Sequence, residues 1–213
     1  MALPSPEVPV GVEEVSHRVA YKGFFRIEIR EFRHLRFDGT WSPVLLREVF
    51  ERGSAVGVLL YDPRADTVVM IRQFLLGAHY AGMPDYPLQI VAGTVGVGET
   101  DEEVARRESV EEAGLVVTDL KKICTYLPSP GGSTEKITLF CALIDSSAAG
   151  GLHGLAEEHE DIRVEVLPAL EAIQRMDEGE ITPSTAVIAL QWLARHHAEF
   201  TRKAREPSPN DNA

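Results

Sequence analysis

Cysteine is scarce in this chain, whose 213 residues include only Cys124 and Cys141. Both lie in apolar, strand-like segments, so two buried reduced thiols are favoured over a disulfide, which cytosolic chains seldom carry. The sequence has no Cys/His spacing typical of a zinc site. Long apolar runs are missing too, and none approaches the ~18 residues that would span a membrane. These absences argue against a disulfide scaffold, a zinc protein and a membrane-spanning protein.

Positive charge is also in short supply. The chain has 21 Lys and Arg against 33 Asp and Glu, a formal net charge of −12. Such a surface repels nucleic-acid phosphates, so we expect no nucleic-acid partner. A phosphorylated small molecule is compatible with this charge when metal ions bridge the two. The N-terminal segment is acidic and proline-rich and lacks the features of a signal peptide, which favours a cytoplasmic protein with no membrane partner.

The first part of the chain is predicted to be a small antiparallel β unit, within residues 1–52. From Phe24 to Phe37 apolar and charged residues alternate, which is the period of a half-exposed strand. Proline and polar residues predict frayed tails over residues 1–14 and 203–213, the latter a disordered tail.

Residues 53–202 are predicted to form the catalytic domain. Apolar strand patterns alternate there with one central helix, over residues 100–113, and two late helices. Mixed strands with these helices predict an α+β fold, a mixed sheet in an α/β/α layered arrangement.

The central helix carries three glutamates, Glu108, Glu111 and Glu112, within little more than one turn. Thr100 with Glu103 fits a capping box at its start. At ~100° per residue, we expect one side of the helix to pack on a sheet and the glutamates to point away from it. The expected packing side consists of Ala105, Ser109, Val110 and Ala113. Like charges at this spacing repel, so either this face is simply solvated or a cation binds there.

A longer pattern favours the cation. G-x5-E-x7-R-E-x-x-E-E-x-G runs from Gly93 through Glu99 and Arg107 to Gly114, and so many fixed positions make a chance match improbable. At these residues the sequence resembles the Nudix hydrolase family. The resemblance implies a loop–helix–loop box that binds divalent cations, usually Mg²⁺ with Mn²⁺ as the alternative. It also implies hydrolysis of a nucleoside diphosphate linked to a further group. Ser109 departs from the family pattern, which prefers an apolar residue there.

The resemblance also implies a ligand set for the metal. Glu108 and Glu112 are the central ligands, Glu111 shares a metal, and the carbonyl of Ala92 is a further ligand. Mg²⁺ takes oxygen ligands of this kind, often together with substrate phosphates. The metal neutralises the pyrophosphate and positions a water for attack. Arg107 is expected to orient the glutamates by a charge-assisted hydrogen bond.

The catalytic base is expected outside the box, because metal occupies the box glutamates. The acidic loop "AEEHED" offers Glu157, Glu158 and Glu160. The resemblance favours Glu158, with Glu160 as second choice. The alternative is that this loop is only a solvated acidic turn.

The flanking segments "LPSPGGSTE" and "GLHGLAEEHEDIRVEV" resemble the bacterial ADP-ribose pyrophosphatase branch of the family. This resemblance implies a homodimer that hydrolyses ADP-ribose to AMP and ribose 5-phosphate. It implies that Phe24 stacks on adenine, that Arg47 lies near the phosphates or terminal ribose, and that Ser129 helps to hold the substrate. The alternatives are a core aromatic for Phe24, a surface ion pair for Arg47 and a plain turn at Ser129.

One departure bears on the substrate. This branch often has arginine at the position of Leu75, so a phosphate-contacting charge is missing unless Arg72 or His79 replaces it. Another nucleoside diphosphate sugar, such as GDP-mannose, is therefore the alternative substrate. A non-catalytic ADP-ribose sensor is less favoured, because all three box glutamates remain.

Overall fold

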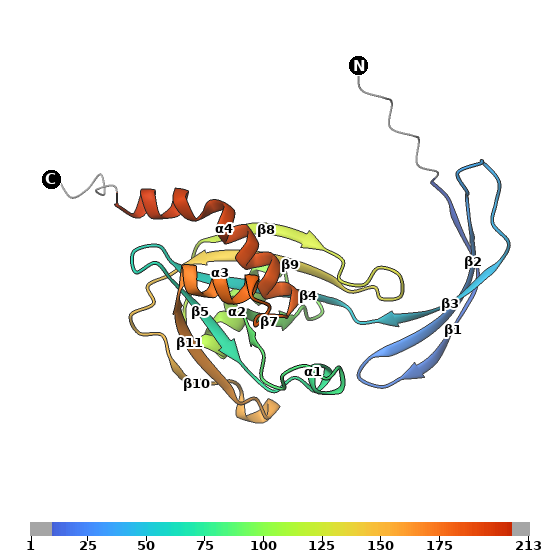
Figure 1. Ribbon diagram of the computed structural model, residues 1–213. Coiled ribbons are helices and arrows are strands. Elements are labelled where there is room, and N and C mark those ends of the chain that lie inside the picture. The colour runs from blue at the N-terminus through green and yellow to red at the C-terminus, as the bar shows by residue number, and fades with distance from the viewer. Residues whose placement is uncertain (1–9, 206–213) are drawn as a thin grey trace, which may run out of the picture. The chain divides into compact units, whose positions relative to one another are not determined.

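The computed structural model describes residues 10–205 and divides into two compact units (Figure 1). The first unit extends to Gly53 and includes Ser129–Glu135, while the second contains Ser54–Pro128 and the chain from Lys136 onward. The assignment of Ser129–Glu135 to the first unit was not expected from the sequence. Each unit is described separately below.

The first unit is a three-stranded antiparallel sheet in the order β1-β2-β3. The strands are β1 (Val12–Lys22), β2 (Arg26–His34) and β3 (Leu45–Glu51). Strand β1 therefore begins inside the segment 1–14 that we expected to be a tail. The reason is charge pairing, because Glu13 lies 2.7 Å from Arg33 across the β1–β2 pair. Residues 1–9 lie outside the described residues.

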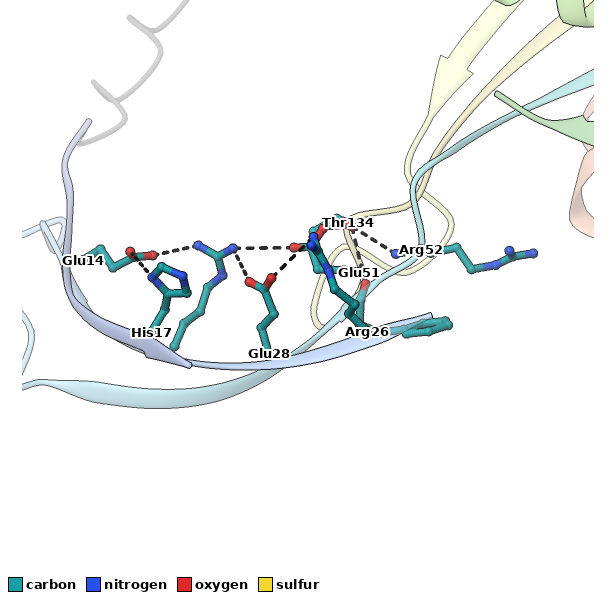
Figure 2. A network of polar contacts seen from close by, with 9 residues as sticks. Glu14, His17, Arg26, Glu28, Glu51, Arg52 and Thr134 are labelled. Atoms are coloured by element: carbon teal, nitrogen blue, oxygen red, sulfur yellow. Dashed lines mark hydrogen bonds and ion pairs between the residues drawn. The ribbon is translucent and has the colours of Figure 1, made fainter. Parts of the chain in front are cut away.

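A chain of ion pairs crosses this sheet (Figure 2). The carboxylate of Glu28 is buried, and Arg30 and Arg26 both contact it. Arg30 also reaches Glu14, with 2.7 Å between Nη1 and Oε2. A buried charge needs such partners, because an unpaired one would be costly to desolvate. The network thus ties β1 and β2 together by charge.

The segment Ser129–Glu135 is fixed to β3 by backbone hydrogen bonds. The Phe50 N–H donates to the Gly132 carbonyl at 2.8 Å, and the Thr134 N–H donates to the Phe50 carbonyl at 3.1 Å. The turn "SPGG" is therefore built into the first unit.

The second unit contains an eight-stranded mixed sheet with the order β10-β11-β5-β4-β9-β8, where β6 pairs with β5 and β7 with β4. Strands β4 and β9 run parallel and the other pairs are antiparallel. The strands are β4 (Ser54–Asp62), β5 (Thr67–Arg72), β6 (Leu88–Gln89), β7 (Val91–Thr94), β8 (Leu120–Tyr126), β9 (Lys136–Leu143), β10 (Gly151–His153) and β11 (Ile162–Pro168).

Four α-helices and one 3₁₀ turn accompany this sheet: α1 (Leu76–Tyr80), α2 (Asp101–Ala113), η1 (Ala156–Glu158), α3 (Ala169–Asp177) and α4 (Ser184–Arg205). Helix α1 lies in a segment that we expected to be a loop. It buries no residue and has no side-chain cap, so it leaves no pattern in the sequence. Helix α4 continues past residue 202, into the expected tail, and residues 206–213 lie outside the described residues. No helix within residues 10–205 is long and apolar enough to cross a membrane.

Two apolar layers lie on opposite faces of the sheet, and alternate residues of β4 contribute to each. Leu59 faces the layer that contains Leu190 of α4, whereas Val58 faces the layer that contains Val104 of α2. Figure 1 shows α3 and α4 together on one side of the sheet. The predicted α+β fold with α/β/α layers is confirmed, and α2 is the helix that covers one face alone.

Helix α2 is delimited at both ends by the predicted signals. Thr100 Oγ1 accepts from the Glu103 N–H at 3.2 Å, and the Glu103 carboxylate accepts from the Thr100 N–H at 2.8 Å. Gly114 ends the helix with a left-handed φ of 67°, a conformation that glycine adopts without a Cβ penalty. The box glutamates therefore sit on a helix with well-defined ends.

Replacing Thr100 with alanine should destabilise the protein by about 1 kcal/mol, because it removes an N-cap acceptor. The measurement is the free energy of unfolding in urea. Thr118→Ala is the control, since Thr118 is exposed and follows the same helix, and it should change stability by less than ~0.5 kcal/mol. Equal losses in the two variants would contradict the capping role.

Candidate active site

Glu112 lies on the packing side of α2, contrary to the helical-wheel expectation. It is only 3% exposed, whereas Val110, which we expected to pack, is 47% exposed. The reason is periodicity: Glu112 follows Ala105 by seven residues, or about two turns, so both point to the same side. The Glu112 Oε2 accepts a hydrogen bond of 2.9 Å from the Ala92 N–H in β7. One box carboxylate is therefore wedged between the helix and the sheet.

Glu108 comes equally close to β7, at Gly93. A Cβ at Gly93 would stand 1.8 Å from Glu108 Oε1, so any side chain at this position would displace the carboxylate. The Glu108 side chain is 12% exposed. The motif glycine is thus required because it lets the strand and the helical carboxylate approach each other.

Arg107 donates hydrogen bonds to two of the box carboxylates, Glu108 and Glu111. Its Nη1 donates to Glu108 Oε1 at 2.8 Å and to Glu111 Oε2 at 2.9 Å. Its Nε donates to Glu99 Oε1 at 3.1 Å, and Glu99 Oε2 in turn accepts from the Gly96 N–H at 2.8 Å. Glu99, Glu108 and Glu111 therefore share one network around the Arg107 guanidinium, whereas Glu112 accepts from the Ala92 N–H instead.

The pKa values of the motif glutamates are shifted in opposite directions by burial and by hydrogen bonding. Burial raises the pKa of Glu108 to about 7, with Arg107 opposing this shift and Glu111 adding to it. Burial likewise holds the pKa of Glu112 well above its usual range, against the hydrogen bond from Ala92. In contrast, Arg107 and the Gly96 N–H lower the pKa of Glu99. The positive charge near the two buried glutamates thus does not offset the cost of burying their carboxylates.

The direction of the Ala92 carbonyl follows from strand geometry, and its role as a metal ligand stays a prediction. In an antiparallel pair the N–H and C=O of one residue point to the same side of the strand. Since the Ala92 N–H points to Glu112, its carbonyl faces the helix side of β7 as well. The register of β7 on β4 places Ala92 opposite Gly57.

These residues fit a divalent cation bound to oxygen. Within residues 10–205 no group of three or more His, Cys, Asp or Glu side chains is arranged so that it could hold a metal ion, and the Arg107 guanidinium bridges Glu108 and Glu111. Buried carboxylates with raised pKa values are costly unless a cation pairs with them. Glu108, Glu111, Glu112 and the Ala92 carbonyl would supply the hard oxygen ligands that Mg²⁺ prefers.

The acidic loop is attached to the same helix. The Gly154 N–H donates to the Glu111 carbonyl at 3.1 Å. Within the loop, Glu160 Oε2 accepts from the Leu155 N–H at 3.3 Å. The negative charge of Glu160 is among the causes that raise the pKa of both Glu108 and Glu112. Glu158 is exposed on the turn η1, so the second-choice residue, Glu160, is the one whose charge reaches the box.

The predicted substrate-binding residues are divided between the two units. Phe24, Arg47 and Ser129 belong to the first unit and Arg72 to the second. Phe24 is 92% exposed and contacts the Phe25 ring edge-on at 4.8 Å, so it is not a core aromatic. Arg47 is exposed, and its Nη1 donates to the Leu46 carbonyl at 2.8 Å. The Ser129 carbonyl accepts from the Ser133 N–H at 3.0 Å.

Arg72 lies at the end of β5 and is held by two partners. Its Nε donates to Glu165 at 2.9 Å and its Nη1 donates to the Tyr86 carbonyl at 2.9 Å. Leu75 contributes no charge, and the nearby His79 pairs with Asp85 at 3.1 Å. Arg72 and Tyr86 also line a hollow of about 580 Å³. Sequence reasoning missed Tyr86, because it lies in a predicted loop without any motif.

Without divalent cations, stability should fall as the pH rises. The Glu108 pKa moves from 4.5 to about 7 on folding, so the folded state keeps its proton longer. That contribution is full below about pH 4.5 and is lost as the pH rises through about 7. The melting temperature in a chelator should therefore drop between about pH 5 and about pH 8, and Mg²⁺ should restore it.

Glu108→Gln should flatten this pH dependence, while Glu102→Gln, on the exposed side of the same helix, should leave it unchanged. A melting temperature that depends on pH equally in all three proteins would contradict the assignment.

Comparisons with known proteins agree with this geometry. The NUDIX domain family matches residues 51–187. ADP-ribose pyrophosphatase of Escherichia coli K12 is 44% identical over 87% of this chain and 89% of its own length. ADP-ribose pyrophosphatase of Haemophilus influenzae is 42% identical over 89% of this chain and 88% of its own length. GDP-mannose pyrophosphatase of Cronobacter sakazakii is 38% identical over 86% of this chain and 95% of its own length.

A solved structure supports the fold. The crystal structure of an ADP compounds hydrolase superposes with a TM-score of 0.67 at 18% identity, covering 89% of this chain and 98% of that chain. The matched residues contain strands β4 to β11, helix α2 and the acidic loop described above, and this chain belongs to the Nudix family of hydrolases.

Proposed function

We propose that this chain hydrolyses the pyrophosphate bond of ADP-ribose and releases AMP and ribose 5-phosphate, using Mg²⁺. The observation that carries the proposal is the packing of Glu108 and Glu112 against Ala92 and Gly93 of β7. The relatives named ADP-ribose pyrophosphatase support the substrate, because they match along nearly nine-tenths of this chain.

The box residues are proposed to have two roles at the metal site, as metal ligands and as a positioning residue. Glu108, Glu111, Glu112 and the Ala92 carbonyl would hold Mg²⁺, or Mn²⁺ in its place. With a divalent cation held there, charge on the diphosphate oxygens would be neutralised and a bound water would become more acidic. Arg107 keeps Glu108 and Glu111 aligned through its two hydrogen bonds. This division leaves no box glutamate free to act as the base.

The base is proposed to come from the acidic loop. Glu158 is the residue favoured by the sequence resemblance, and it is exposed on the turn η1. Glu160 lies where its charge acts on Glu108 and Glu112, so it fits a second role beside the metal. The two carboxylates can be separated experimentally.

Four further residues are proposed to contact the substrate. Phe24 offers an exposed ring for the adenine, which suits stacking because its face is not buried. Arg47 and Arg72 offer charge for the phosphates or the terminal ribose, and Ser129 lies in a turn fixed to β3. Arg72 replaces the charge that Leu75 lacks.

A second candidate substrate is GDP-mannose. The GDP-mannose pyrophosphatase relatives, at up to 38% identity, cover most of this chain, and Leu75 removes a charge associated with the ADP-ribose branch. ADP-ribose is favoured because those relatives share the higher identity over the same span. Steady-state release of AMP from ADP-ribose, compared with release of GMP from GDP-mannose at equal low concentration, decides between the two. A preference for GDP-mannose would reject the leading proposal.

The protein is further proposed to be a cytoplasmic homodimer. All residues of β1 are exposed, including the apolar Val12, Val15 and Val19. A strand that exposes several apolar side chains on a small sheet suits a partner of the same chain. Light scattering should give a molar mass of about twice that of one chain, and a monomer at micromolar concentration would contradict this proposal.

Glu112→Gln should lower kcat with Mg²⁺ by at least ~100-fold, because it removes a metal ligand. The amide keeps an oxygen to accept from the Ala92 N–H, so the fold should survive, as circular dichroism would verify. Glu102→Gln is the matched control on the same helix and should keep its activity. Wild-type turnover in Glu112→Gln would show that the metal site has been misassigned.

Glu158→Gln should lower kcat with little change in KM if Glu158 is the base, since a base acts in the chemical step. Glu160→Gln should instead raise the Mg²⁺ concentration needed for half-maximal rate. Glu157→Gln is the control, being an exposed neighbour on the same turn. Similar effects from all three substitutions would rule out a single loop base.

A further inference from the structure

Two hollows in the second unit lie next to the acidic loop. The smaller, of about 250 Å³, is lined by Gln73, Phe74, Tyr86 and residues 158–161. The larger, of about 580 Å³, is lined by Arg72, Tyr86, Leu152, Asp161, Arg163 and Glu165. They share Tyr86 and Asp161, so the two hollows adjoin. The function proposed above uses Arg72 and the loop carboxylates but assigns no role to Gln73, Phe74 or Tyr86.

The charges of the smaller hollow disfavour a phosphate. Its lining contains three acidic residues, Glu158, Glu160 and Asp161, against one histidine, His159, and no lysine or arginine. Ionised carboxylates only accept hydrogen bonds, so the group that suits this hollow is neutral and rich in donors. Hydroxyl groups meet this requirement.

A further acceptor in the lining has no partner. Gln73 Oε1 is the one buried side-chain polar atom within residues 10–205 that lacks a hydrogen bond. An unsatisfied buried amide oxygen is costly, and native proteins usually satisfy such atoms with protein, water or ligand. The terminal torsion of glutamine is soft, so this oxygen can turn toward the hollow at small cost. The missing partner is a hydrogen-bond donor.

Two aromatic rings form the remaining wall. Phe74 and Tyr86 are 47% and 52% exposed, and their rings meet at 5.7 Å and 61°. Aromatic faces pack against the C–H surface of a ligand while nearby polar groups fix its orientation. Aromatic faces beside several acceptors form an environment suited to a sugar ring.

The position of the hollow indicates which part of the substrate enters it. Glu160 lines the hollow and packs against Gly154, whose N–H donates to the Glu111 carbonyl at 3.1 Å, so the hollow opens beside the box helix. In a nucleoside diphosphate sugar each end of the diphosphate carries a sugar, so a sugar is the first group beyond the phosphates. The terminal ribose has one hydroxyl more than the nucleoside ribose, at its anomeric carbon, and better matches the many acceptors.

We propose that the smaller hollow binds the terminal sugar of the substrate, and that Gln73 and Tyr86 are specificity-determining residues in it. Gln73 accepts a hydrogen bond from a sugar hydroxyl, and Tyr86 packs against the ring. The proposal rests on the proposed function, since it assumes a nucleoside diphosphate sugar at the metal box.

The test compares two substrates that both release AMP: ADP-ribose and the methyl ester of ADP, which has the nucleoside and diphosphate but no terminal sugar. Gln73→Leu should lower kcat/KM for ADP-ribose by roughly 2- to 10-fold, equivalent to one net hydrogen bond. It should leave kcat/KM for the methyl ester unchanged. Its melting temperature should equal or exceed that of the wild type, because an unsatisfied polar atom is removed.

Tyr86→Ala should likewise reduce kcat/KM for ADP-ribose alone. Tyr80→Ala is its matched control, because Tyr80 is 81% exposed and lines neither hollow. The Tyr86 backbone carbonyl that holds Arg72 is unaffected by this change.

The outcomes separate the two proposals. Equal losses on both substrates would overturn the sugar subsite, since Gln73 or Tyr86 would then act on the diphosphate or the nucleoside. Unchanged rates on both substrates would overturn it as well. If the wild type releases AMP from the methyl ester but not from ADP-ribose, the proposed function itself fails.

Discussion

The contact between helix α2 and strand β7 is the constraint on which the rest of the site depends. Glu112 accepts a hydrogen bond from the Ala92 N–H, and Glu108 occupies the space that a Cβ at Gly93 would fill. Two carboxylates are thereby buried at the helix–sheet junction, where desolvation raises their pKa values. Arg107 offsets part of this cost in the metal-free protein. The part of the desolvation cost that Arg107 does not offset favours a divalent cation, because such an ion would pair with the buried carboxylates.

The fold supplies this contact by placing small residues where the layers meet. Ala105, Ser109 and Ala113 are buried on α2, and the Ser109 hydroxyl donates to the Ala105 carbonyl at 2.7 Å. A hydroxyl satisfied within its own helix can be buried without a further partner. The departure of Ser109 from the family pattern is therefore compatible with close packing of the helix.

Much of the fold could be predicted from the sequence because its signals are local. The capping box at Thr100 and the stop at Gly114 delimit α2, and alternation identifies the strands. The helical wheel placed Glu112 outward, although its seven-residue spacing from Ala105 already puts it on the packing side. The N–H that its buried carboxylate accepts from, at Ala92, lies across the layers. The other failures were tertiary in origin. Helix α1 and the start of β1 at Val12 carry no local signal, since pairing with β2 fixes the latter.

In the candidate site, too, local motifs could be predicted from the sequence and tertiary contacts could not. The sequence motif identified Glu108, Glu111 and Glu112, and the roles assigned to them, to Ala92 and to the substrate contacts stay predictions. The hollow beside the loop could not be anticipated, because Gln73, Tyr86 and Asp161 are far apart in the chain and meet only in the folded sheet. No spacing rule connects such residues.

The acidic loop is joined to α2 through a backbone hydrogen bond, from the Gly154 N–H to the Glu111 carbonyl. A backbone anchor does not depend on which side chains follow it. Gly154 itself is fixed by its φ of 101° and by the proximity of Glu160, and His159 also has a left-handed φ, of 57°, but positions 155–157 have no such restriction. During evolution the loop can therefore exchange side chains beside the proposed base, and with them substrate preference, while the metal helix stays constant. Divergence of substrate preference within one hydrolytic chemistry is the expected consequence of this attachment.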